Sequence, residues 1–202
     1  MSMECERKYC NEDFAQLRSR LREAGATCLG AHFESNSIWD EGDGDLRRTG
    51  RLLRLRTQTW PDHERHLITL KLKAANVGGC KMREERELAV ADASVMAQVL
   101  LGLGYTIRLR YEKVREVWRF PELEVVLDRV PFAEVVELEG DMEAIDRRAA
   151  QLGLDASGAT TDSYHTLHRA WREARGLPPG LDFVFTPRQR EEILRSLRED
   201  AS

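Results

Sequence analysis

The stretch Glu4-Cys5-Glu6-Arg7-Lys8 decides the fold, because its charged residues stand at every second position. Side chains at positions i and i+2 of a β-strand point to the same face of a sheet, about 7 Å apart. Glu4, Glu6 and Lys8 would therefore share one face of a strand. Like charges that close together repel, so a group of opposite sign should lie between the two carboxylates.

The same spacing recurs along the chain as pairs of like charge. The later pairs are Arg54/Arg56, Lys71/Lys73, Glu85/Glu87, Lys113/Arg115 and Glu137/Glu139. A single pair of this kind is typical of the solvent-exposed face of an antiparallel sheet. Exposed faces usually mix both signs, whereas each of these strands carries mainly one sign. The recurrence favours one cavity with an acidic wall for metal cations and a basic wall for phosphate oxygens.

Eight segments have the residue pattern of strands, most of them antiparallel to their neighbours. They span about residues 3–9, 29–38, 51–60, 65–75, 82–90, 106–119, 122–129 and 133–139. Amphipathic segments that begin near Asn11, Asp92, Asp141 and Thr161 predict helices. Eight antiparallel strands are enough to close a barrel with a narrow interior. The sequence therefore predicts an α+β fold, an eight-stranded antiparallel β-barrel with helices packed outside it.

The last residues of the chain differ in character from the rest. Leu177-Pro178-Pro179-Gly180 is typical of a linker, and Thr186-Pro187-Arg188-Gln189 predicts the start of a short helix. We expect a main domain at residues 1–176, followed by a linker and C-terminal helix at 177–202. Phe183 and Phe185 would anchor this tail, either on the main domain or on a partner subunit.

Composition excludes several classes of function. The 202 residues, of which 42% are hydrophobic and 33% charged, are typical of a globular chain. No apolar run approaches the roughly 20 residues of a membrane helix, so we expect a cytoplasmic protein without membrane contact. The net charge of −4 argues against general nucleic-acid binding. The cysteines have no metal-binding spacing, and reduced thiols are expected at Cys5, Cys10, Cys28 and Cys80.

In their order along the chain, these motifs resemble the CYTH, or triphosphate tunnel metalloenzyme, family, whose members include class IV adenylyl cyclases and thiamine triphosphatases. The motifs are Glu4-Cys5-Glu6-Arg7-Lys8, Leu53-Arg54-Leu55-Arg56, Thr69-Leu70-Lys71-Leu72-Lys73, Arg83-Glu84-Glu85-Arg86-Glu87, Lys113-Val114-Arg115, Asp128 and Glu137/Glu139. The resemblance covers roughly residues 3 to 170. Val130-Pro131-Phe132-Ala133 departs from the family's Leu-Gly step, which leaves the alignment near Phe132 open.

The resemblance implies a role for each charged residue in a tunnel that holds a triphosphate. The expected ligands of one or two Mg²⁺ or Mn²⁺ ions are Glu4, Glu6, Asp128, Glu137, Glu139, Glu85 and Glu87. The expected phosphate-binding residues are Lys8, Arg54, Arg56, Lys71, Lys73, Arg83, Lys113 and Arg115. The residues expected to matter most for catalysis are Glu4, Glu6, Lys8, Arg56 and Lys71.

The resemblance also orders the candidate functions. The first is a class IV-type adenylyl cyclase that converts ATP to cyclic AMP and pyrophosphate. The alternative is a triphosphatase that hydrolyses thiamine triphosphate or inorganic triphosphate. A non-catalytic sensor of polyphosphate or nucleotide ranks third, because it would not need the carboxylates that are present. A homodimer is expected from the resemblance and from the tail.

Overall fold

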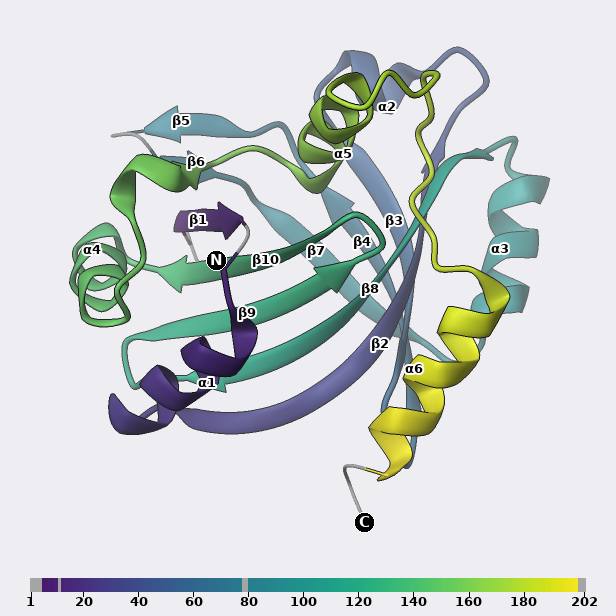
Figure 1. Cartoon of the computed structure of the whole chain (residues 1–202). Coiled ribbons are helices and arrows are strands. Elements are labelled where there is room, and N and C mark those ends of the chain that lie inside the picture. The colour runs from purple at the N-terminus through teal and green to yellow at the C-terminus, as the bar shows by residue number, and fades with distance from the viewer. Residues whose placement is uncertain (1–4, 11, 78–79, 200–202) are drawn as a thin grey trace.

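The computed structural model describes residues 5–10, 12–77 and 80–199, and its centre is one strongly curved sheet (Figure 1). The strands of this sheet are β1 (Cys5–Cys10), β2 (Thr27–Asp40), β3 (Leu52–Thr59), β4 (Glu64–Lys71), β7 (Glu85–Val90), β8 (Thr106–Arg119), β9 (Leu123–Val130), β10 (Ala133–Gly140) and β11 (Ala159–Thr160). A separate hairpin consists of β5 (Ala75–Val77) and β6 (Cys80–Met82). The helices are α1 (Phe14–Glu23), α2 (Asp45–Arg48), α3 (Ala93–Gly102), α4 (Met142–Gln151), α5 (Tyr164–Glu173) and α6 (Pro187–Glu199), with a 3₁₀ turn at Ala156–Gly158.

The sheet has nine strands in the order β11-β1-β10-β9-β8-β2-β3-β4-β7, and every pairing is antiparallel. The predicted α+β class and antiparallel arrangement are confirmed. The predicted eight-stranded barrel is wrong, because among the described strands no pairing joins the two ends of the sheet, β11 and β7. After Lys71 the chain leaves the sheet to form the β5–β6 hairpin, which contacts β1 and shortens the strands expected at 65–75 and 82–90.

The register of the sheet places opposite charges beside each other on one face. Lys8 of β1 lies opposite Glu137 of β10, and Arg115 of β8 lies opposite Asp128 of β9. Directly opposed residues of an antiparallel pair have close Cβ atoms, so their side chains meet. The alternation in the sequence therefore gives the sheet one charged face.

The opposite face of these strands is apolar and is covered by helices. Leu17 and Leu21 of α1 and Ile145 of α4 pack with Val125 and Leu138 of the sheet in one fully buried cluster. Helix α3 covers a second cluster near β3 and β4, and α6 lies along β2 (Figure 1). Burial of this apolar face stabilises the curved sheet by removing its hydrophobic side chains from water.

Side-chain caps begin the helices close to the predicted positions. Asp92 and Asp141 are the N-caps of α3 and α4, as expected. The N-cap of α1 is Asp13, whereas the predicted cap was Asn11. Asn11 lies outside the described residues. At the start of α6, the Thr186 and Gln189 side chains each accept a hydrogen bond from the other's backbone N–H, which is the predicted capping box.

The cysteines and the tail complete the fold. Cys5 is disulfide-bonded, so the expectation of a reduced thiol was wrong there, whereas Cys10 and Cys28 are free. Phe183 and Phe185 are both buried against the same chain, which is the intramolecular alternative for the tail.

The division into domains at residue 176 stays a prediction. None of the helices in the described part of the chain has the length and apolar run of a membrane span.

Asp40, at the end of β2, fixes the connection to β3. Its Oδ1 accepts hydrogen bonds from the backbone N–H of Glu41 and of Leu46, both at 2.9 Å, and its Oδ2 accepts one from Arg47 at 3.1 Å. Asp40 itself is buried. The bonds from Leu46 and Arg47 satisfy donors at the start of α2, which a helix cannot satisfy internally.

We predict that Asp40→Ala destabilises the protein by about 2–4 kcal/mol, because it leaves buried backbone donors without acceptors. Urea unfolding monitored by circular dichroism measures the change. Asp62→Ala is the matched control, since that carboxylate is exposed on the β3–β4 turn and its removal should leave the unfolding midpoint unchanged. Equal midpoints for the two variants would contradict this role of Asp40.

Candidate active site

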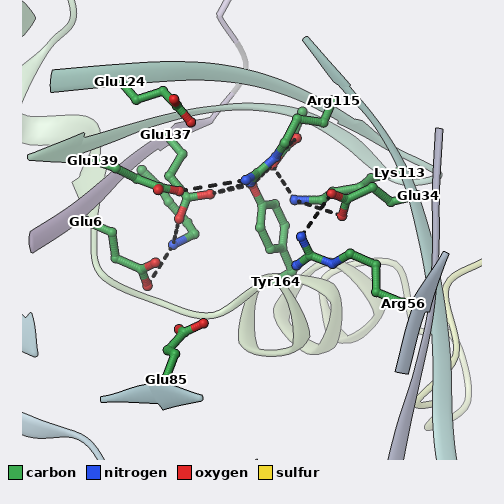
Figure 2. Close-up of polar contacts among 12 residues, drawn as sticks. Glu6, Glu34, Arg56, Glu85, Lys113, Arg115, Glu124, Glu137, Glu139 and Tyr164 are labelled. Carbon is green, nitrogen blue, oxygen red and sulfur yellow. Dashed lines mark hydrogen bonds and ion pairs between the residues drawn. The ribbon is translucent and has the colours of Figure 1, made fainter. Parts of the chain in front are cut away.

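The centre of the charged face is Arg115 of β8, which contacts two carboxylates (Figure 2). Its Nε and Nη2 donate to the two oxygens of Asp128 at 2.8 and 2.6 Å, and Nη2 also donates to Glu137 Oε2 at 3.0 Å. Asp128 is fully buried, and Lys113 Nζ donates to it at 2.9 Å. Burial alone would raise the pKa of Asp128, but the Arg115 and Lys113 charges outweigh it and lower the pKa.

Lys8 of β1 contacts the same carboxylate from the other side. Its Nζ lies 2.8 Å from Glu137 Oε1 and 3.0 Å from Glu6 Oε1, and the side chain is buried. Burial would lower the pKa of this ammonium group, yet the nearby charges of Glu137 and Glu6 raise it. The pKa of Glu137 is lowered in turn, because Lys8 and Arg115 outweigh the effect of burial.

Glu6 and Glu139 form the acidic side of the network, where burial and the charge of Glu137 outweigh the nearby cations. Glu139 lies 3.8 Å from Arg115 Nη1, at the edge of ion-pair range. Burial and the charge of Glu137 raise the pKa of Glu139 to about 7. Burial and Glu137 also raise the pKa of Glu6. These two carboxylates resist ionisation, so an additional cation beside them would stabilise their charged forms.

Arg54 and Lys71 extend the cationic side along β3 and β4. Arg54 is buried, and its guanidinium donates to the Tyr111 hydroxyl at 3.5 Å and to Thr69 Oγ1 at 3.4 Å. Lys71 pairs with Glu85 of β7. Burial, and next the charge of Arg54, lower the pKa of Lys71. Both side chains are therefore held where a bound anion would strengthen their charged forms.

Glu34 of β2 was not singled out by the sequence patterns, although it is fully buried among the cations. Its Oε1 accepts hydrogen bonds from Arg56 Nη1 at 3.1 Å and from Gln58 Nε2 at 3.2 Å, and Lys113 Nζ lies 3.6 Å from Oε2. Burial would raise the pKa of Glu34, but the charges of Arg56 and Lys113 outweigh it, so the pKa lies well below the ordinary value. A signal was available, since Glu34 and Asn36 stand two apart in a predicted strand.

Tyr164, the first residue of α5, is the other functional candidate that the sequence patterns did not assign. Its hydroxyl donates to Asp128 Oδ2 at 2.5 Å and lies 3.2 Å from Glu137 Oε2. Lys8 and Lys113 each lie over its ring, at 5.6 and 5.3 Å from the centroid. Burial, and next the Asp128 charge, raise the pKa of this phenol well above its ordinary value, so it remains a donor.

Some predicted site residues lie apart from the central network. Lys73 is exposed, and Arg83 donates to the backbone carbonyls of Leu72 and Gly50. Glu87 accepts a hydrogen bond from Thr69 Oγ1 at 2.9 Å, which places it beside Arg54 rather than beside Glu139. Glu4 lies outside the described residues.

The carboxylates of the site are suitable ligands for a divalent cation, but the described side chains are not arranged around one common position. Among the described side chains, no group of three or more His, Cys, Asp or Glu residues is close enough to hold a metal ion. Glu137 and Asp128 are already bound by cations of the protein. Glu6 also pairs with Lys8, but its pKa and that of Glu139 are raised, so these are the carboxylates for which a hard cation is the suitable additional partner.

Solved structures share this fold. A Vibrio parahaemolyticus protein described as a "putative adenylate cyclase" is 18% identical with a TM-score of 0.68, covering 83% of this chain and 98% of its own. A Hippeastrum protein is 17% identical with a TM-score of 0.64, covering 90% and 99%; it is described as a "putative adenylyl cyclase" with a dominant triphosphatase activity.

The amino-acid sequence is also similar to known proteins. A Methanocaldococcus jannaschii protein that carries the name "putative adenylate cyclase" is 23% identical over 180 residues, which are 87% of this chain and 99% of that relative. Residues 2–152 match the family described as the CYTH domain. With its charged sheet face built from the predicted motifs, and with three quarters of its length matched, the chain belongs to the CYTH domain family.

Proposed function

We propose that this protein is a metal-dependent enzyme that cleaves a triphosphate, and that hydrolysis is its first candidate reaction. One observation carries the proposal: buried and half-buried cations from three strands alternate with carboxylates on one sheet face. Arg115 and Lys113 come from β8, Lys8 from β1 and Arg54 from β3. Buried charges of this number are costly for folding, so their retention points to a charged ligand.

In the proposed mechanism, the phosphate chain takes over the cations that the carboxylates now bind. Lys8, Arg54, Arg56, Lys71, Lys113 and Arg115 would contact phosphate oxygens. The arginines can do so through two parallel hydrogen bonds, and the lysines act as point charges. Negative charge grows on the leaving phosphate as the bond to phosphorus breaks, and fixed cations stabilise that charge without having to reorient.

Glu6 and Glu139 are the proposed metal-binding carboxylates, with Glu137 and Asp128 beside them and Glu4 as a further candidate from the sequence motif. A bound Mg²⁺ or Mn²⁺ would polarise the phosphate oxygens and activate water for attack. Tyr164 would keep Glu137 oriented while the cations exchange partners. The proposed phosphate contacts of Lys73 and Arg83 are weaker, because Lys73 is exposed and Arg83 donates to backbone carbonyls.

An adenylate cyclase is the second candidate, favoured by the name of the Methanocaldococcus jannaschii relative, which this chain matches over 99% of that protein. The resemblance places cyclisation first, but two observations favour hydrolysis. Cyclisation needs a surface that directs the ribose 3′-hydroxyl at phosphorus, and no predicted motif supplies one. The Hippeastrum protein also shows that a cyclase name can accompany a dominant triphosphatase activity.

The decisive experiment incubates the purified chain with inorganic triphosphate, thiamine triphosphate or ATP, each with Mg²⁺ or Mn²⁺, and separates the products by chromatography. We expect release of phosphate that stops when EDTA is added and falls strongly in Glu6→Gln. Cyclic AMP with pyrophosphate from ATP would instead identify a cyclase. Tight triphosphate binding without any product would mean that the protein is a sensor.

Arg56 separates the catalytic role of the network from its structural role. Arg56→Ala should lower turnover roughly 100-fold by removing a phosphate contact. It should also destabilise the fold by about 2 kcal/mol, because Glu34 keeps its buried charge with one partner fewer. In the double variant with Glu34→Gln, urea unfolding should recover most of the lost stability while turnover stays low. An unchanged rate in Arg56→Ala would show that this arginine serves only the fold.

The raised pKa of Glu139 predicts a pH effect on the stability of the metal-free protein. Its folded value is about 7, and an unfolded glutamate has a pKa of about 4.3. The folded state therefore retains a proton that the unfolded state releases, so stability decreases as pH rises from about 4 to 7. In EDTA, the wild type should lose on the order of 1–2 kcal/mol relative to Glu139→Gln across this range. Parallel pH curves for the two proteins would contradict the shift.

A further inference from the structure

The C-terminal tail, defined as residues 181–199, lies beyond the family match at 2–152 and fills an open edge of β8. Strand β9 pairs only with residues Val114 to Arg119 of β8. The tail takes the edge before them: Phe183 N donates to Arg110 O at 3.1 Å, and Glu112 N donates to Phe183 O at 3.0 Å. These backbone bonds fix the position of Phe183 along β8.

Glu112, a buried carboxylate on β8, makes a second set of contacts with the tail. Glu112 Oε2 accepts a hydrogen bond from the Phe185 backbone N–H at 3.0 Å, and Oε1 accepts one from Arg190 of α6. Glu112 is 3% exposed, so the tail covers its charge almost completely. Both contacts compensate the charge that the tail buries, so they hold the tail against β8.

The Phe183 side chain packs between two elements of the candidate site. Its ring centroid is 5.2 Å from that of Tyr111 on β8 and 5.3 Å from that of His165 on α5. Tyr111 accepts the hydrogen bond from Arg54. Tyr164, next to His165, packs against the apolar cluster that contains Phe183, and its hydroxyl donates to Asp128. The buried ring of Phe183 therefore supports both Tyr111, the partner of Arg54, and the start of α5, where Tyr164 binds Asp128.

We propose that Phe183 is a positioning residue, through which the tail holds Tyr111 against Arg54 and holds α5 against Asp128. The proposal rests on the proposed triphosphate function, because its purpose is to keep the cationic side aligned for a phosphate chain. Phe183 acts through Tyr111 and α5 and has no contact of its own with the reacting atoms. The tail is thus a working part of the site, although it lies outside the matched family region.

Two substitutions on the same tail test the proposal. Phe183→Leu keeps an apolar side chain but removes the flat ring against Tyr111. Phe185→Leu is the matched control, because Phe185 is similarly buried but packs outside the site, against Phe33 and Ile193. We expect Phe183→Leu to raise KM for the triphosphate about tenfold with a smaller change in kcat. Phe185→Leu should leave KM within about twofold.

A double-mutant cycle distinguishes positioning from a general loss of stability. Tyr111→Phe removes the hydroxyl that accepts from Arg54, so Phe183→Leu should add little to its effect on KM if both act on Arg54. Fully additive effects would show that Phe183 does not act through Tyr111, which would overturn the proposal. So would equal KM changes in Phe183→Leu and Phe185→Leu, or no change in either.

A titration that needs no turnover separates this inference from the proposed function. Burial raises the pKa of Tyr111, but Arg54 and the neighbouring cations outweigh it and lower the pKa. Ultraviolet titration, with Tyr111→Phe to identify the signal, should show this pKa moving upward in Phe183→Leu and staying in place in Phe185→Leu. A Tyr111 signal that does not move would overturn the positioning role. Absence of triphosphate cleavage by the wild type would reject only the proposed function.

Discussion

The contact of Arg115 with Asp128 and Glu137 is the interaction on which the charged face of this sheet depends. A guanidinium remains charged under all ordinary conditions, so its burial requires carboxylates in fixed positions. Asp128 and Glu137 supply them from the two neighbouring strands of a hairpin. Lys8 then binds the Glu137 oxygen that Arg115 does not contact, whereas Lys113 and Tyr164 share Asp128 Oδ2 with Arg115. Each member of the network is thus held by charges from other strands.

This mutual compensation explains how one protein can contain so many buried charges and still fold. The cations would repel each other if the carboxylates were absent, and the carboxylates would be protonated if the cations were absent. A metal–triphosphate complex carries both signs itself, so it can replace both sets of partners at once. A ligand with only one sign would leave half of the network without compensation.

The sequence predicted the charged face well because the two-residue period of a strand is a strong geometric constraint. Lys8, Arg54, Arg56, Lys113 and Arg115 all lie on the predicted face. The patterns did not assign Glu34 or Tyr164, since neither belongs to a like-charged pair. Closure of the barrel was predicted wrongly, because the residues after Lys71 form a hairpin of their own, which no alternation of charges could indicate.

The open end of the sheet has a consequence for how this protein behaves with other copies of itself. Strand β7 has an unpaired side in the described sheet, and such an edge can template intermolecular strand addition. Its first residues, Glu85, Arg86 and Glu87, carry charges that discourage such addition. Leu88, which is 66% exposed, lacks that protection. The same acidic pair that resembles a ligand motif therefore also protects the chain against aggregation, at the edge where the sheet stays open.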